Sequence, residues 1–260
     1  MKCYEDLKGK RVLVTGASRG IGAGVVKAFS EAGARVFLHY RSDAELAAKI
    51  ASELPGEVHL FRADLGKAEE LEALFEAIKT TFGALDVAVN NAGVVLPALE
   101  PEEITDEHYH RLADVNIRGT LFCCLREIAL MRPDGGSIIN IGSVHQDTTV
   151  PGWTLYAMSK GAIHGMTGQL AIQEGKNGIR VNNILPGYID VDKEPVDEAV
   201  NLSIPVRRAG VPADIAECCL FLGSKRSEFI NGADITVDGG VSRKLARTVM
   251  CFKPNREKKL

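Results

Sequence analysis

The sequence has 260 residues and a formal net charge of −3; 45% of its residues are hydrophobic and 25% are charged. This composition is typical of a globular protein, and it lacks the basic excess that attracts nucleic acid or an anionic membrane. No apolar run is long enough to span a membrane, and residues 1–10 are too polar for a signal peptide. We therefore expect a cytoplasmic protein with neither nucleic acid nor a membrane as a partner.

The six cysteines form no metal-binding or disulfide pattern. None belongs to a Cys-x-x-Cys pair, and the vicinal pairs Cys123–Cys124 and Cys218–Cys219 lie in apolar helical segments. Buried free thiols in a reducing compartment are expected, and no metal site is predicted.

Short apolar runs alternate with amphipathic helical patterns along the chain. The first run, Arg11–Thr15, opens into a glycine-rich turn and a helix that Gly33 terminates. Asp43 is placed to cap a second helix. Further strands are expected at 35–40, 58–62, 85–90, 137–141, 179–185 and 234–237. Further helices are expected at 44–54, 71–82, 106–131, 156–176 and 212–222.

This alternation predicts the α/β class, with a parallel sheet of about seven strands covered by helices on both faces. No linker or repeat divides the chain, so residues 1–241 are expected to form one doubly wound domain. Residues 242–260 are a basic C-terminal extension to which we assign no function. Ligands of such a domain bind outside the carboxyl ends of the strands.

The turn after the first strand places glycines at 16, 20 and 22. This spacing differs from G-x-G-x-x-G, but its physical use is the same. Glycines between a strand and a helix allow a pyrophosphate to approach the backbone, and the N–H groups of the helix start bind the anion. Packing of the helix on the strand is the alternative explanation.

Tyr156 and Lys160 are four residues apart in an expected helix, so their side chains share one face. An ammonium near the phenol favours the phenolate, which would suit the tyrosine to general acid–base catalysis. Ser143 follows the strand at 137–141, and its hydroxyl could reach the same place. The Tyr-x-x-x-Lys spacing also arises by chance, so it requires support from other motifs.

Six motifs occur together in order, and they supply that support. The motifs are Thr15-Gly16-x-x-x-Gly20-Ile21-Gly22, Asn90-Asn91-Ala92-Gly93, Asn116, Ser143, Tyr156-x-x-x-Lys160 and Pro186-Gly187. With them the sequence resembles the short-chain dehydrogenase/reductase family over about residues 7–241. That resemblance implies a single Rossmann domain, usually tetrameric, which transfers hydride between NAD(P) and a secondary alcohol or carbonyl.

The resemblance also implies roles for individual residues. Tyr156 is the general acid/base, and Lys160 lowers its pKa and holds the nicotinamide ribose. Ser143 hydrogen-bonds the reacting oxygen, and Asn116 kinks its helix to hold a water that links Lys160 to solvent. Asp64 would bind the adenine amine, although it could equally start a helix. The implied cofactor contacts are Gly16, Ser18, Arg19, Gly20, Ile21, Gly22, Tyr40, Arg41, Asp64, Leu65, Asn91, Ala92, Gly93, Tyr156, Lys160, Pro186, Gly187 and Ile189.

The end of the second strand indicates which nicotinamide cofactor is used. An NAD enzyme places a carboxylate about 20 residues past the loop, for the ribose 2′-OH. This chain has Tyr40, Arg41 and Ser42 there. Arg19 and Arg41 could pair with a 2′-phosphate, which favours NADP(H). NAD(H), with both arginines merely solvated, is the alternative.

The substrate is less well specified. Locally the sequence is similar to the glucose 1-dehydrogenases of this family, in Tyr4–Lys10, in Ser143-Val144-His145 and in residues 178–183. A sugar or polyol substrate would contact His145, Gln146, Trp153 and Tyr188. Two features depart from that pattern: the apolar run at 94–97 replaces an acidic residue, and the segment 188–208 is short.

Three alternatives remain. A small-ketone reductase is one, and a 3-oxoacyl-acyl-carrier-protein reductase is another. Arg207 and Arg208 would attract the acidic carrier, but a cluster of acidic residues near the site would repel it. A non-catalytic NADP-sensing protein is the third, although such proteins typically lose the tyrosine or the lysine. The acidic residues near the site are Asp190, Asp192, Glu194, Asp197 and Glu198.

A homotetramer is expected because the segment 238–240 resembles one that packs between subunits.

Overall fold

The structure is a computed structural model that describes residues 4–191 and 196–244. Asp192 and Glu194, two of the acidic residues weighed above, lie outside the described residues, as does most of the expected C-terminal extension at 242–260. The division of the chain at residue 241 therefore stays a prediction.

The described strands form one parallel sheet in the order β3-β2-β1-β4-β5-β6-β7. The order reverses between β1 and β4, which makes the carboxyl ends of these two strands the switch point where ligands bind. This topology confirms the predicted doubly wound Rossmann domain. The strands are β1 (Arg11–Val14), β2 (Arg35–Tyr40), β3 (Val58–Arg62), β4 (Val87–Asn90), β5 (Gly136–Ile141), β6 (Ile179–Pro186) and β7 (Asp234–Val237).

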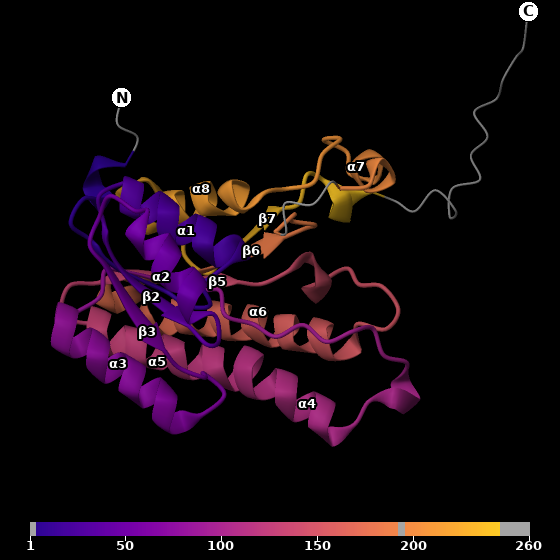
Figure 1. Ribbon diagram of the computed structural model, residues 1–260, viewed down its shortest axis with the longest axis horizontal. Coiled ribbons are helices and arrows are strands. Elements are labelled where there is room, and N and C mark those ends of the chain that lie inside the picture. The colour runs from indigo at the N-terminus through magenta and orange to yellow at the C-terminus, as the bar shows by residue number, and fades with distance from the viewer. Residues whose placement is uncertain (1–3, 192–195, 245–260) are drawn as a thin grey trace, which may run out of the picture.

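Helices cover both faces of the sheet (Figure 1). One layer contains α1 (Gly20–Glu31), α2 (Ala44–Ser52) and α8 (Pro212–Gly223). The other contains α3 (Ala68–Phe82), α5 (Thr120–Met131) and α6 (Thr154–Glu174).

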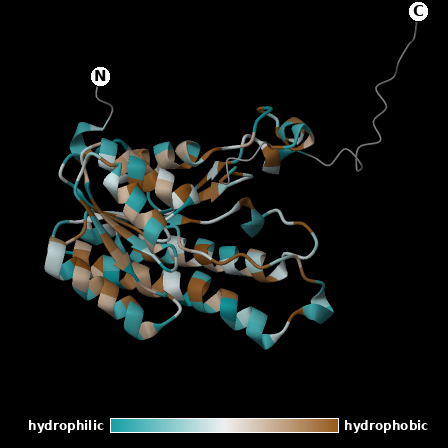
Figure 2. Cartoon of the chain, in the orientation of Figure 1, coloured by the Kyte–Doolittle hydropathy of each residue, from teal (hydrophilic) through white to brown (hydrophobic). Residues whose placement is uncertain are grey.

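Alternation along the strands produces the two cores. Val12 and Val14 pack against the α1–α8 layer, whereas Leu13 between them packs against the α3–α5–α6 layer. Both faces of each central strand are therefore apolar, and Figure 2 shows hydrophobic residues along the strands and the helix faces that meet them. A rigid sheet of this kind fixes the loops at its carboxyl edge.

The structure departs from the expected elements at three places. The helix expected at 106–131 is α4 (Asp106–Ala113), a π-helical turn (Asp114–Gly119) and α5. A short helix, α7 (Glu198–Ser203), lies in the segment expected to be a loop. Asp43 occupies the N-cap position of α2 but makes no side-chain capping bond, so its predicted capping role is wrong.

Two further findings concern the cysteines and the membrane. Cys123, Cys124 and Cys219 are buried free thiols, and Cys218 is a half-buried one.

Within residues 4–191 and 196–244, the chain has no helix that combines the length and the apolar character needed to cross a membrane.

Candidate active site

The glycine-rich turn between β1 and α1 lies tightly against the loop that follows β4. A Cβ on Gly16 would lie 2.7 Å from the Ala92 Cα, and one on Gly22 would lie 2.5 Å from the Gly16 carbonyl oxygen. The turn therefore requires glycine at both positions. At the start of α1 the N-cap residue, Arg19, makes no side-chain capping bond, and the first turn has no acidic residue. The N–H groups there suit a pyrophosphate.

Thr15 and Asn91 join the two loops. The Thr15 hydroxyl accepts hydrogen bonds from the backbone N–H groups of Asn91 and Ala92, both at 3.0 Å. The Asn91 amide donates to the carbonyl oxygens of Thr15 at 3.0 Å and Gly16 at 2.9 Å. These bonds satisfy buried polar groups and set the shape of the cleft.

His39, at the end of β2, also holds the turn, and the sequence analysis did not identify it. Its Nδ1 accepts from the Gly16 N–H at 3.1 Å, and its Nε2 lies 2.9 Å from the Ala63 carbonyl oxygen. Burial lowers the pKa of His39 to about 4, so the ring is neutral at pH 7. The neutral tautomer with its proton on Nε2 satisfies both bonds.

Tyr156 and Lys160 lie together at the start of α6, beside the end of β5. The Lys160 Nζ is 5.5 Å from the centre of the Tyr156 ring and donates to the Ile141 carbonyl oxygen at 2.7 Å. Burial lowers the pKa of Lys160 to about 8. The ammonium is therefore held by the end of the strand, within reach of the cleft.

The expected fall in the pKa of Tyr156 does not occur in this geometry. Burial raises the pKa of Tyr156 above its ordinary value, and the Ser143 hydroxyl opposes that rise. Lys160 lies against the ring face and is bonded to Ile141, so its charge does not offset the burial.

Ser143 is buried at the end of β5. Its Oγ accepts a bond from the His145 N–H at 3.2 Å, which leaves the hydroxyl proton for another acceptor. Ser143 and Tyr156 therefore present two hydroxyl groups to one place, as a reacting carbonyl or alcohol oxygen requires.

Asn116 lies inside the π-helical turn. Its Oδ1 accepts from the Val94 N–H at 2.7 Å, and its Nδ2 donates to the Val94 carbonyl oxygen at 2.9 Å and to the Ser159 Oγ at 3.3 Å. The helix distortion thus links the loop after β4 to the catalytic helix, a common position for a π-turn at a functional site.

Two of the four expected substrate residues form an aromatic wall at Tyr156. The His145 ring stacks on Trp153 with centroids 5.0 Å apart, and both rings meet the Tyr156 ring edge-on. Gln146 is occupied elsewhere, since Asn183 donates to its Oε1 at 3.1 Å and its Nε2 lies 3.2 Å from an Asp234 oxygen. Tyr188 is exposed after β6.

The expected 2′-phosphate edge contains a third arginine. The Arg62 Nε, at the end of β3, donates to the Arg41 carbonyl oxygen at 3.0 Å. Arg19, Arg41 and Arg62 are all exposed, and none of them belongs to an ion pair within residues 4–191 and 196–244. Pairing of β2 with β3 brings the ends of both strands together, which explains the position of Arg62.

The remaining expected cofactor residues lie along the same edge of the sheet. Asp64 Oδ1 accepts from the Gly66 N–H at 3.0 Å, and Leu65 packs its side chain into the core. Gly187 donates its N–H to the Val237 carbonyl oxygen at 3.1 Å, and Ile189 pairs with Gly210 in a parallel bridge. Three others are partly or fully buried beside the turn: Ser18, Ile21 and Tyr40.

Comparison with known proteins decides the family. Residues 16–242 match the family described as Enoyl-(Acyl carrier protein) reductase. The chain is 37% identical to 3beta-hydroxysteroid dehydrogenase 1 of Eggerthella lenta, over 92% of this chain and 96% of that protein. The chain belongs to the short-chain dehydrogenase/reductase family.

Other members of the short-chain dehydrogenase/reductase family are similar over nearly the whole chain. Glucose 1-dehydrogenase 2 of Bacillus subtilis is 35% identical, over 92% of this chain and 97% of that protein. A short-chain dehydrogenase from Burkholderia cenocepacia J2315, solved in complex with NADP, is 31% identical with a TM-score of 0.84, over 90% of this chain and 98% of that one. The predicted family and the local likeness to glucose 1-dehydrogenases are confirmed.

As a member of the short-chain dehydrogenase/reductase family, the chain is an oxidoreductase that acts on CH–OH groups with a nicotinamide cofactor. The glycine-rich turn between β1 and α1 fits that cofactor. Its glycines leave the backbone uncovered beside the loop after β4, and no side chain caps the N–H groups at the start of α1. Among the described residues, no group of three His, Cys, Asp or Glu side chains could hold a metal ion.

Proposed function

We propose that this protein is an NADP(H)-preferring oxidoreductase in which Tyr156 transfers the proton and Ser143 holds the reacting oxygen. The observation that carries the proposal is the position of the Tyr156 phenol. It is hydrogen-bonded to the Ser143 hydroxyl, and the Lys160 ammonium lies 5.5 Å from the centre of its ring. NADP(H), when bound, supplies or accepts the hydride. The chain's own residues orient the substrate oxygen and move the proton.

Arg41 and Arg62, at the ends of β2 and β3, support the preference for NADP(H). The Arg62 guanidinium is held at the end of β2 by its 3.0 Å bond to the Arg41 carbonyl oxygen, and Arg41 itself occupies the place where an NAD enzyme would carry a carboxylate. Guanidinium groups bind phosphate with charge-assisted bonds. The complex of the Burkholderia cenocepacia relative with NADP is consistent with this proposal.

Arg41→Ala tests the preference, and Arg35→Ala is the matched control. Both arginines belong to β2 or its flank, but Arg35 is at the amino end of the strand, where it pairs with Glu57 at 2.6 Å. We expect Arg41→Ala to raise the KM for NADPH at least about 10-fold, the loss of roughly 1.4 kcal/mol of binding, with little change for NADH. An NADH preference in the wild-type protein would refute the assignment.

We propose a sugar or polyol as the first substrate class. The similarity to glucose 1-dehydrogenase 2 supports it, and so does the stacked pair of His145 and Trp153, because an aromatic face packs well on the apolar face of a sugar ring. Oxidation of glucose and of other polyols with NADP, measured at the absorbance of NADPH, tests this class.

An apolar secondary alcohol or ketone is the second candidate, and specific residues favour it. The wall behind Trp153 is built by Leu96, Leu112 and Leu155, and Val95 in the same loop is 56% exposed. The three leucines are buried, so of these groups only Val95 is accessible, and it offers no hydrogen bond to a sugar hydroxyl. The similarity to the 3beta-hydroxysteroid dehydrogenase is consistent with such a substrate. Faster turnover of bulky cyclic ketones than of sugars would select this candidate.

Acyl thioesters and the absence of turnover complete the test. Reduction of a 3-oxoacyl thioester faster than any sugar or ketone would establish the acyl-carrier alternative. Absence of turnover across the whole panel, with tight NADP(H) binding, would establish the sensing alternative and contradict the enzyme proposal.

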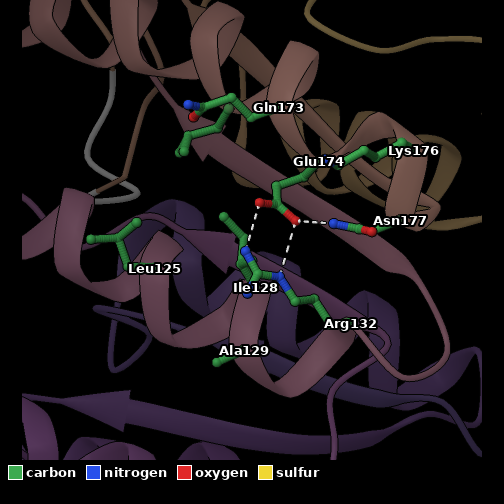
Figure 3. A pocket seen from close by; sticks show the side chains of 9 residues that line it. Leu125, Ile128, Ala129, Arg132, Gln173, Glu174, Lys176 and Asn177 are labelled. Carbon is green, nitrogen blue, oxygen red and sulfur yellow. Dashed lines mark hydrogen bonds and ion pairs between the residues drawn. The ribbon is translucent and has the colours of Figure 1, made fainter.

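We also propose a cytoplasmic homotetramer. Groups that support association lie on the outer face of α5 and α6, where Leu125 is 38% and Ile172 is 80% exposed. A groove of about 710 Å³ runs between these helices, crossed by the Arg132–Glu174 ion pair (Figure 3). Ile172→Glu is expected to lower the mass measured by light scattering, and an unchanged mass would exclude this face as a contact.

A further inference from the structure

Glu127 is a carboxyl group in the core, outside the residues assigned to catalysis. It follows Cys123 and Cys124 by one turn of α5 and shares their buried face, whereas its neighbour Arg126 turns outward and pairs with Glu72. Glu127 is 0% exposed, and no ion pair found among the described residues includes it. An ionised carboxylate without a cation is costly in such a place.

The carboxyl group belongs to a buried polar set that we call the Glu127 cluster: Asn90, Cys124, Glu127, Asn140 and Thr167. The Asn90 Nδ2 donates to Glu127 Oε2 at 2.9 Å and to Asn140 Oδ1 at 3.1 Å, and the Asn140 Nδ2 donates to the Thr167 Oγ1 at 2.9 Å. Two oxygens have no donor: Asn90 Oδ1 and Glu127 Oε1.

The two unsatisfied oxygens belong to the amide and the carboxyl group that already share a bond. When the carboxyl group is ionised, Glu127 Oε1 and Asn90 Oδ1 can only accept hydrogen bonds. One proton between these two oxygens would give both of them a partner. We propose that Glu127 is a neutral carboxylic acid that donates from Oε1 to the Asn90 Oδ1, and that it acts as a positioning residue for the active site. Both oxygens are then satisfied without a cation.

The link to the active site runs through the ends of two strands. Asn90 and Asn140 are register partners on β4 and β5. The residue after Asn90 is Asn91, whose amide holds the Gly16 carbonyl oxygen at 2.9 Å, and the residue after Asn140 is Ile141, which accepts from Lys160 at 2.7 Å. The Glu127–Asn90–Asn140 bonds therefore fix the cofactor turn and the catalytic lysine relative to one another.

The surroundings keep the acid form over the neutral range. The titratable groups that face Glu127 are the thiols of Cys123 and Cys124, whose pKa values are raised by burial and by Glu127 itself. Asn90, Asn140 and Thr167 carry no charge. Burial raises the pKa of Glu127 to about 8, against an opposing hydrogen bond from Asn90. In the folded protein the group therefore ionises only as the pH rises through about 8.

Infrared spectroscopy tests the protonation state without any substrate. The wild-type protein in D₂O should show the C=O band of a protonated carboxyl group at neutral pH, which fades as the pH rises through about 8. Glu127→Gln should lack this band, and the control Glu72→Gln, at an exposed ion pair on α3, should keep it. A wild-type protein without the band at pH 7 overturns the proposal, whatever the variants do.

The positioning role has a kinetic test, and this part alone rests on the proposed function. Glutamine supplies the N–H that the neutral acid supplies as O–H, so Glu127→Gln should retain kcat/KM and the NADP dissociation constant within about 3-fold at pH 7. Because the pKa of Lys160 is also about 8, both proteins should keep an alkaline limb there, but kcat/KM should fall less steeply with pH in Glu127→Gln, which has lost one of the two ionisations. Glu127→Leu should weaken NADP binding at every pH. An alkaline limb that is identical in wild type and Glu127→Gln, and so belongs to Lys160 or Tyr156, overturns the role.

Discussion

The Nδ1 of His39 accepts a hydrogen bond from the backbone N–H of Gly16 at 3.1 Å, so a side chain at the end of β2 holds the glycine-rich turn. The opposite nitrogen, Nε2, lies 2.9 Å from the Ala63 carbonyl oxygen and must carry the proton. A second proton, on Nδ1, would turn this nitrogen into a donor that faces another donor, the Gly16 N–H. The turn is therefore compatible only with a neutral His39.

This relationship predicts an acid-sensitive fold. The pKa of His39 is lowered from about 6.5 to about 4, so between these values the unfolded chain binds more protons than the folded one. The free energy of unfolding should fall by up to about 3 kcal/mol as the pH drops through that window. His39→Gln should remove this slope in urea denaturation, and the exposed control His110→Gln should not. Equal slopes in all three proteins would show that His39 does not titrate here.

Lys160→Met should change stability and activity in opposite directions. The ammonium is buried, and burial lowers its pKa from 10.5 to about 8, so the charged form destabilises the fold at pH 7. Methionine should raise the free energy of unfolding by up to about 3 kcal/mol. It should lower kcat/KM at least about 100-fold and weaken NADP binding.

The pH dependence provides the check on Lys160. Between pH 8 and 10.5 the unfolded chain binds more protons at this residue, so the wild type should gain stability as the pH rises through that window. Lys160→Met should lack the gain. A methionine variant that is less stable than wild type at pH 7 would mean that the bond to Ile141 outweighs the burial of the charge.

Asn116→Ala should reduce both stability and turnover. The Asn116 amide satisfies the N–H and the carbonyl oxygen of Val94 at 2.7 and 2.9 Å, and each unpaired buried group costs about 1–3 kcal/mol. Asn231→Ala is a matched control, because the Asn231 amide bonds the Val181 N–H at 2.9 Å and the Ala171 carbonyl oxygen at 3.0 Å, remote from Tyr156 in the fold. Both variants should melt earlier in calorimetry, but only Asn116→Ala should lose kcat. Equal kinetic losses would reduce Asn116 to a stabilising role.

Much of the fold and of the site is visible in the sequence because periodicity and glycine positions report local geometry. The strands at 11–15 and 137–141, the turn at 16–22 and the Tyr156–Lys160 face all depend on spacing alone. The spacing of residues shows which face of a helix or strand they share. The parallel topology then brings the carboxyl ends of β1, β4 and β5 to the same edge of the sheet.

Other features depend on long-range contacts that spacing does not contain. His39 and Arg62 acquire their partners only when β2 lies between β1 and β3. Glu127 resembles any polar helical residue until its turn of α5 is buried against Asn90. The rise in the pKa of Tyr156 depends on how much of the phenol is covered, which a Tyr-x-x-x-Lys motif does not state.

The rate of hydride transfer by Tyr156→Phe is the most direct test of the proposed chemistry. The assay follows NADPH oxidation with the carbonyl compound that the wild type reduces fastest, alongside NADP binding, and Tyr109→Phe at an exposed position of α4 is the control. Loss of the proton donor should lower kcat at least about 100-fold while the NADP dissociation constant changes only a few-fold. Turnover by Tyr156→Phe at the wild-type rate would contradict the central role of Tyr156.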